Sequence, residues 1–371
     1  MNSTTVPDQS PPGPAAPRAF VPWLTRALVA ANAIVFLLTL AGGGGLLQAD
    51  AQRLIEWGTN FAPLTASGEW WRLATAMFLH FGLVHLLFNM WALWVIGGLV
   101  ERLYGPARFA VIYALAGVAG GLASMAWNPL ANSAGASGAI FGIIGAQLAF
   151  FMRGGHLIPA EVLRAQRNST LAFIAYAVVF GLVVPGIDNA AHFGGLATGF
   201  GLGWMLTRPL GRLLSRAQLQ RGLLGAGVLA VLVLAAGVVA ANWSAGRHAD
   251  EQAYLLDWRR VVREEPAVLA RMDRVMSGAR DGKAGDAEVV AWLEEDGIPF
   301  YRGAEAALGR HRLPQDSPLA AGQGEALEFV RGRAAAMTLF AEGVRENDRD
   351  KLERASRLLA GDGKTPAGPT G

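Results

Sequence analysis

The feature that most constrains this chain is a run of 44 residues, Phe109 to Met152, without a charged side chain. A run of this length is enough for two membrane crossings of roughly 20 residues each. Trp127-Asn128-Pro129 is the natural break between the two crossings, and Ser137 follows near the start of the second. Because a polar side chain in hydrocarbon is costly and rare, Ser137 is a candidate functional residue.

Other weakly charged runs predict five more spans, which makes seven in all. Hydrophobic residues form 52% of the chain and charged residues only 16%, as expected for a polytopic membrane protein with a soluble part attached. The predicted class is therefore all-α, a membrane helix bundle of six core spans plus a seventh. Outside the long run, the spans are expected at about 24–47, at 73–100, twice between Arg167 and Arg208 with a break at Pro185-Gly186, and at 222–243.

The last third of the chain differs in composition. Residues 244–371 hold 22 acidic and 19 basic side chains, whereas residues 1–243 hold 7 and 13. Helical spacing of Leu255, Trp258 and Val261 predicts a helical soluble domain, with His248 and His311 at its surface. The expected organisation is a disordered tail (1–20), a six-span core (21–208), a basic loop with the seventh span (209–243), a soluble helical domain (244–360) and a disordered tail (361–371).

Basic residues in the short loops predict the orientation. With seven spans, eleven arginines lie on one side of the membrane and only Arg53 and Arg72 on the other. Since Lys and Arg favour the cytoplasmic side, the amino terminus is expected in the cytoplasm and residues 244–371 outside it, with the protein in a cell inner membrane. This basic excess gives no case for nucleic-acid binding. The aromatic-rich loop 48–77 is expected at the membrane interface.

The chain contains no cysteine, which excludes disulfides, thiolate metal ligands and a cysteine nucleophile. No cluster of metal ligands is apparent in the sequence, and neither a metal nor another cofactor is expected.

Polar residues of three spans share one depth under this topology. Spans two, four and six all run inward, and His80, His85 and Asn89 lie early in span two, Ser137 starts span four and His192 is early in span six. Asp188 is the only acidic residue nearby, close to the outer surface. A shared depth predicts that these side chains can meet within the membrane.

The spacing of these residues along their helices also predicts that the side chains come together. His85 and Asn89 are four residues apart and share a face. Small residues form two stripes that let membrane helices approach closely. One stripe follows His192 and the other follows Ser137; their members are Gly195, Gly199 and Gly203, and Gly138, Gly142 and Ala146.

Serine and histidine at one depth suggest nucleophilic catalysis. A serine hydroxyl becomes a good nucleophile when a base takes its proton, and histidine is the usual base near neutral pH. The Asn89 amide, a ring N–H of His85 and the Ser137 backbone N–H are suitable donors for an oxyanion. Taken alone, Gly-x-Ser-Gly is more often a helix-packing motif, and Trp71-Arg72 can be a simple interfacial anchor. The occurrence of Gly-x-Ser-Gly together with His-x4-His-x3-Asn and a later Ala-His favours an active site.

The sequence resembles the rhomboid intramembrane serine proteases over roughly residues 24–208. The resemblance rests on five motifs: Glu69-Trp70-Trp71-Arg72, His80-x4-His85-x3-Asn89, Glu101-Arg102, Gly135-Ala136-Ser137-Gly138 and Asn189-Ala190-Ala191-His192-Phe193-Gly194-Gly195.

The resemblance implies roles for several residues of these motifs and for Phe141, which packs on the catalytic histidine in the family. Ser137 is implied as nucleophile and His192 as general base, with His85, Asn89 and the Ser137 N–H as the oxyanion hole. The implied substrates are transmembrane proteins in the lipid bilayer, cleaved in or near a membrane helix. The implied supporting residues are His80, Gly135, Gly138, Phe141, Trp71, Arg72, Glu101, Arg102 and Asn189.

Two alternatives stay open at this point. An inactive rhomboid-like protein would bind membrane clients without cutting them, although the loss of Ser or His expected for it is not seen. A transporter is disfavoured because no membrane carboxylate or inverted repeat is evident. The sequence gives no oligomeric state, no substrate identity and no role for the outer domain.

Overall fold

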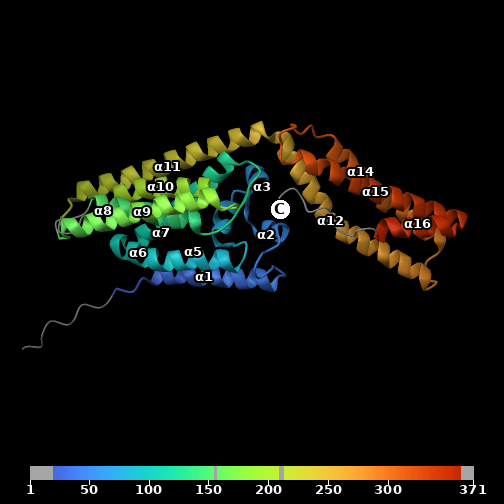
Figure 1. Ribbon diagram of the computed structural model, residues 1–371, viewed down its shortest axis with the longest axis horizontal. Helices are drawn as coiled ribbons and strands as arrows, with labels where there is room; N and C mark the ends of the chain where they lie inside the picture. The colour runs from blue at the N-terminus through green and yellow to red at the C-terminus, as the bar shows by residue number, and fades with distance from the viewer. Residues whose placement is uncertain (1–19, 154–156, 209–212, 361–371) are drawn as a thin grey trace, which may run out of the picture.

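The computed structural model describes residues 20–153, 157–208 and 213–360 of the chain. A helical bundle is joined by one long helix to an elongated helical arm (Figure 1). Helices dominate the described residues, and the strands are two pieces of two residues each, so the predicted all-α class is confirmed. The predicted disordered tails, 1–20 and 361–371, lie outside the described residues apart from Phe20.

The bundle comprises the elements from α1 to α11 (Figure 1). They are α1 (Trp23–Ala41), α2 (Ala51–Trp57), β1 (Asn60–Phe61), α3 (Ala62–Ala66), α4 (Arg72–Thr75), the 3₁₀-helix η1 (Ala76–Phe78), α5 (Leu83–Ala92), the π-helix η2 (Leu93–Gly97), α6 (Gly98–Tyr104), α7 (Pro106–Trp127), β2 (Asn132–Ser133), α8 (Ser137–Arg153), α9 (Ala160–Val183), α10 (Asn189–Leu206) and α11 (Arg216–Arg247).

Four helical segments of the described chain are long and apolar enough to cross a membrane: α1, the continuous segment Leu83–Tyr104, α7 and α11. The α8 helix is apolar but shorter, and it begins at Ser137, as the sequence predicts. The α9 and α10 helices lie beside these segments in the bundle (Figure 1). The chain is therefore a multi-pass integral membrane protein.

The second span begins later than predicted. We expected it from Leu73, but α5 starts at Leu83. The residues before it belong to the first loop, because Gly82 lies so close to the backbone of Leu47 that an added Cβ would be 2.0 Å from its carbonyl oxygen. His80 accordingly lies in the loop that precedes the span.

The centre of the bundle is the contact between α8 and α10, with α7 beside them. A Cβ placed on Gly195 would be 2.0 Å from the carbonyl oxygen of Gly138, and one on Gly199 would be 1.9 Å from that of Gly142. These two residue pairs come from the two predicted small-residue stripes, so the predicted close approach is confirmed.

The first loop, residues 42–82, is tied together by polar contacts. Its strand β1 pairs antiparallel with β2, with Asn60 opposite Ser133. Arg72 is buried and donates to the Glu69 carboxylate at 2.8 Å and to the carbonyl oxygens of Ile55 and Thr59 at 2.6 and 3.1 Å. A buried guanidinium that bonds three backbone or carboxylate groups fixes the shape of the loop.

The arm beyond α11 consists of α12 (Ala249–Arg280), α13 (Asp286–Trp292), the π-helix η3 (Leu293–Gly297), α14 (Ile298–Gly309), α15 (Ala320–Glu346) and α16 (Arg349–Ala360). Its core gathers Tyr254, Trp258, Tyr301 and other buried side chains. The boundary predicted between 243 and 244 falls inside α11, which continues to Arg247.

The arm shares its core with the first loop of the bundle. Ile55 and Phe61, exposed by only 1% and 2%, belong to the same hydrophobic cluster as Tyr254 and Trp258. One hydrogen bond adds to this contact, since Arg259 Nε donates to Gln52 Oε1 at 3.3 Å. A second joins the arm to the turn after α7, where Gln252 Nε2 donates to the Pro129 carbonyl at 2.8 Å. The arm therefore contacts both the first loop and the turn that leads to β2.

The expected surface position of His311 is wrong. The residue is buried, with its Nε2 2.7 Å from Asp257 Oδ2. Asp257 precedes it by 54 residues, on α12. Because this partner is so distant in sequence, the residues around His311 do not indicate that it is buried.

Candidate active site

Ser137 is held at the start of α8 by the strand and turn that precede it. The two residues of β2 are paired with β1, and Gly135 N–H donates to the Ala76 carbonyl at 2.9 Å. Gly135 has a φ of 121°, a conformation that side-chain-bearing residues rarely adopt. As the first residue of the helix, Ser137 has a backbone N–H without a carbonyl partner in its own helix, where the helix dipole favours negative charge.

His192 lies in the first turn of α10, between Ala191 and Gly195, which both lie close to α8. Its ring is stacked on Phe141, with ring centroids 4.1 Å apart and planes 9° apart. A Cβ on Gly138 would be 3.5 Å from the Ala191 carbonyl oxygen. The neighbours of Ser137 and His192 are thus in contact across the helix pair. In the described chain the Ser137 hydroxyl and the His192 ring do not hydrogen-bond each other.

The His85 ring, on α5, is oriented by the loop that precedes this helix. Its Nδ1 accepts a hydrogen bond from the Phe81 backbone N–H at 3.4 Å, so the ring proton belongs on Nε2. That nitrogen faces the turn before Ser137, since a Cβ on Gly135 would be 2.9 Å from it. The same position is 3.9 Å from Asn89 Nδ2, which also donates to the His85 carbonyl at 2.9 Å. Two N–H donors therefore converge on Gly135.

The expected supporting residues fall into two groups. His80 is buried with its ring edge-on to that of His85, centroids 5.1 Å apart, so it lies against the candidate oxyanion donors. Glu101 and Asn189 act farther away. Glu101 accepts from the backbone N–H groups of Leu24 and Thr25 at 3.1 and 2.8 Å, and so caps α1.

Asn189 links α10 to the preceding helix by donating to the Gly181 carbonyl at 2.7 Å. Trp71 is half exposed, with the Arg72 guanidinium 4.7 Å from its ring centroid. Arg102 is exposed and has no hydrogen bond or ion pair within the described chain. Only its neighbour Glu101 is part of a buried contact.

Sequence reasoning placed Asp188 near the surface and missed its role. Its Oδ1 accepts from the Ala191 N–H at 2.9 Å and caps α10, while its Oδ2 accepts from the Ser133 hydroxyl at 2.6 Å. One carboxylate thus joins the helix of His192 to the strand that leads to Ser137. The sequence contains a hint of this role, since Asp188 is the only charged residue between Arg167 and Arg208.

The comparison with known proteins bears directly on this arrangement. Residues 67–209 match the family model described as Rhomboid domain. The chain is 37% identical over 148 residues to the Putative rhomboid protease YdcA of Bacillus subtilis, and the match covers 40% of this chain and 72% of that protein. The chain belongs to the rhomboid family.

Two other rhomboids match a similar share of the chain. The Rhomboid protease GluP of Bacillus subtilis is 40% identical over 179 residues, and the Rhomboid protease AarA of Providencia stuartii is 33% identical over 197 residues. These matches cover 48% and 47% of this chain, and 34% and 69% of the two relatives. The chain therefore spans about a third of GluP. Neither α11 nor the arm lies within the matched rhomboid domain.

Proposed function

We propose that this rhomboid is an intramembrane serine endopeptidase that hydrolyses peptide bonds in or near the transmembrane helices of its substrates. Ser137 and His192 act as a dyad. The observation that supports this most is the convergence at Gly135, where the turn before α8 meets the donors of α5 while Phe141 of α8 is stacked on the His192 ring.

The chemistry follows from this arrangement. Ser137 Oγ attacks the scissile carbonyl carbon as His192 takes its proton, and the negative charge develops on the carbonyl oxygen. His85 Nε2–H, an N–H of Asn89 and the Ser137 N–H stabilise that oxyanion. The His192 proton then passes to the leaving amine, and water hydrolyses the acyl-enzyme. Nucleophile–base hydrogen bonds are often long without substrate and shorten in the complex, which accounts for the missing Ser137–His192 bond.

A lateral hollow supports a membrane-embedded substrate. It has a volume of about 190 Å³, and residues of α5, η2, α8 and α9 line it, among them Trp91, Val95, Ile144 and Phe173. The α9 helix on one side buries only Thr170 and Gly181. An apolar opening beside a helix with so little buried surface suits entry of a transmembrane helix from the lipid.

The orientation is also a proposal. The amino terminus lies in the cytoplasm, and the arm after α11 lies outside it, in the periplasm if the membrane is an inner membrane. The arginine asymmetry of the short loops supports this. A reporter enzyme fused after Gly371 that works only outside the cytoplasm tests it, and activity in the cytoplasm would overturn the seven-span topology.

Proteolysis is tested with the purified full-length protein in liposomes and a reporter transmembrane substrate. The wild type is expected to cleave the reporter, whereas Ser137→Ala and His192→Ala abolish cleavage and retain the melting temperature. A fluorophosphonate should label the wild type at Ser137 only. EDTA should have no effect. Normal cleavage by Ser137→Ala would exclude the proposed nucleophile.

The second candidate is a rhomboid-like protein that binds membrane clients without cutting them. Such a protein would share the rhomboid family and the helical fold with the proposed protease, so the reporter assay has to separate the two. This function predicts that wild type and Ser137→Ala retain the reporter equally and release no fragment, and that no fluorophosphonate adduct forms.

A further inference from the structure

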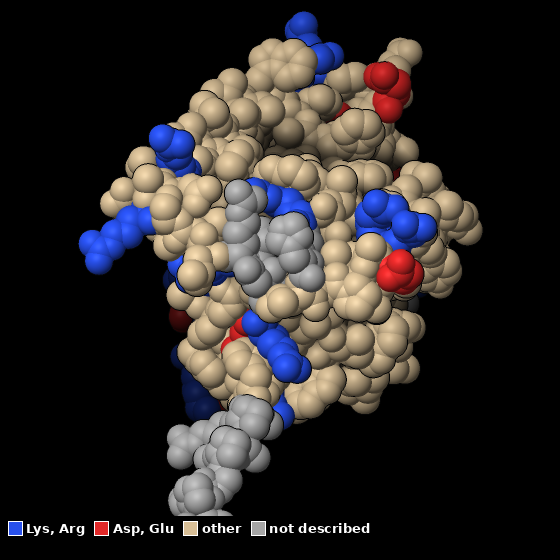
Figure 2. Space-filling view, turned by 90° about the vertical axis from the view of Figure 1, so that its left-hand side faces the viewer, with Lys and Arg blue, Asp and Glu red and all other residues tan. Residues whose placement is uncertain are grey.

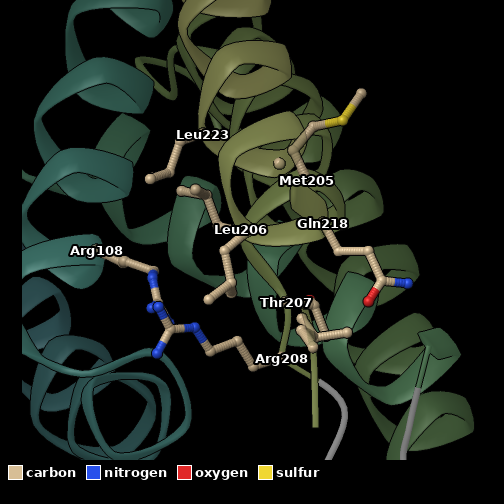
Figure 3. Close-up of a pocket in the computed structure, with 10 residues that line it drawn as sticks. Arg108, Met205, Leu206, Thr207, Arg208, Gln218 and Leu223 are labelled. Carbon is tan, nitrogen blue, oxygen red and sulfur yellow. The ribbon is translucent and has the colours of Figure 1, made fainter. Parts of the chain in front are cut away.

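A second hollow lies at the opposite end of the bundle from Ser137. The α10 helix begins near the candidate site, and its last residues line this hollow. The start of α7, the end of α10 and the start of α11 form its walls (Figure 3). Its volume is about 30 Å³, against about 190 Å³ for the lateral hollow. The lining is divided between polar side chains, Arg108, Arg208 and Gln218, and apolar ones, Met205, Leu219 and Leu223.

Arg108 and Arg208 extend toward each other across this hollow (Figure 3). The charge of Arg208 acts unfavourably on Arg108, as expected for neighbouring guanidinium groups. Arg108 Nη1 donates to the Tyr104 carbonyl at 3.2 Å, but neither arginine forms a salt bridge with a carboxylate of the described residues. Two facing cations without a counter-charge form a ready site for an anion.

The surroundings specify the kind of anion. Basic residues predominate over acidic ones on this end face of the bundle (Figure 2). Guanidinium groups bind phosphate oxygens in a bidentate way. Gln218 lies at the rim, and Met205, Leu219 and Leu223 offer an apolar wall. A phosphate next to apolar surface at the end of a membrane bundle is the chemistry of a phospholipid headgroup.

We propose that Arg108 and Arg208, at the mouth of this hollow, bind the phosphate group of an anionic phospholipid. Arg108 and Arg208 donate to the phosphate oxygens, and the apolar wall contacts the first part of the lipid chain. The bound headgroup neutralises the facing arginines and ties the start of α7 to the end of α10. This inference does not depend on the proposed protease activity.

Binding is measured by native mass spectrometry of the full-length protein in detergent, titrated with phosphatidylglycerol. The variants are the double substitution Arg108→Gln with Arg208→Gln, and Gln218→Glu. The double variant is expected to weaken lipid binding by about tenfold or more, since the loss of one charged contact of about 1.4 kcal/mol suffices. Gln218→Glu is expected to weaken it as well, because it places a negative charge at the rim that repels the phosphate. Gln218→Glu is the sharper variant, because Gln218 Oε1 accepts from the Ser215 N–H in a capping box that glutamate preserves.

The control is Arg164→Gln with Arg167→Gln, which removes the same charge from α9 and should bind like the wild type. Equal affinity of the wild type and Gln218→Glu would overturn the proposal, whether or not the double variant folds. Inorganic phosphate and glycerol phosphate are added as competitors. If millimolar amounts of either displace the lipid completely, a soluble phosphate is the ligand and the lipid assignment is wrong; retention of the lipid supports it.

Discussion

Phe141 lies flat on the imidazole of His192, with 4.1 Å between ring centroids and 9° between ring planes. His192 Nδ1 is buried and has no hydrogen-bond partner in the described chain. The nearby carboxylate of Asp188 is instead occupied by Ala191 N–H and Ser133. The candidate base is therefore positioned by packing, where many serine hydrolases use an acidic residue.

Replacement of Phe141 should consequently slow catalysis. Stacked aromatic pairs contribute about 0.5–1.5 kcal/mol, so Phe141→Ala is expected to lower kcat for a reporter substrate by about 2- to 12-fold, with little change in KM. The matched control is Phe193→Ala, beside His192 but exposed. Equal effects of the two substitutions would show that the stacking does not position the base.

The oxyanion donors give a second prediction. Loss of one such donor typically costs about 2.7–4 kcal/mol of barrier, or roughly 10²–10³ in rate. We expect Asn89→Ala at the lower end, because His85 and the Ser137 N–H remain. Phe88→Ala on the exposed face of the same helix is the control. Unchanged turnover of Asn89→Ala in the reporter assay would mean that Asn89 serves packing.

The contact of α8 with α10 predicts a large difference between two glycines. Gly199→Ala forces a methyl group to 1.9 Å from the Gly142 carbonyl oxygen, whereas Gly227 of α11 has open space. Overpacking of this kind costs about 1–3 kcal/mol. Thermal unfolding in detergent should therefore detect a clear loss for Gly199→Ala and none for Gly227→Ala. A stable Gly199→Ala protein would contradict the described helix approach.

Because the arm and the first loop share a hydrophobic core, removal of the arm should lower the stability of the loop. The sequence predicts that removal of the arm after about Ala245 leaves the reaction with a serine-directed probe intact. The structure adds a stability cost, because Ile55 and Phe61 lose their cover. Phe61→Ala should cost about 3–5 kcal/mol in the full-length protein and clearly less in the truncated one. Equal costs in both backgrounds would show that the arm does not stabilise the loop.

Alkaline pH should weaken the arm through Tyr254. Burial raises the pKa of its hydroxyl to about 12, against about 10 in an unfolded chain. The folded state keeps a proton that the unfolded state releases, so this part of the stability is complete below about pH 10 and is lost as pH rises toward 12.

Because the Tyr254 hydroxyl has no hydrogen-bond partner in the described chain, Tyr254→Phe should be harmless at neutral pH. Unfolding followed between about pH 8 and 12 should give a smaller alkaline loss for this variant than for the wild type. Parallel pH curves for the two proteins would contradict the prediction.

The sequence alone determined the features that depend on local pattern. The charge-free run and helical spacing predicted the start of α8 at Ser137, and the two small-residue stripes predicted the contact of Gly195 and Gly199 with α8. These succeed because a membrane helix satisfies its own backbone, so its ends and faces follow from nearby residues.

Only the tertiary structure decided the contacts between distant segments. Phe61 joins the hydrophobic cluster of Trp258, His311 pairs with Asp257, and Asp188 accepts a hydrogen bond from Ser133. The start of the second span at Leu83 also depended on Gly82 meeting Leu47 across the loop. Each of these partners is brought close only when the whole chain has packed. The residues next to an aromatic ring or a carboxylate in the sequence do not tell whether that side chain faces solvent or such a distant partner.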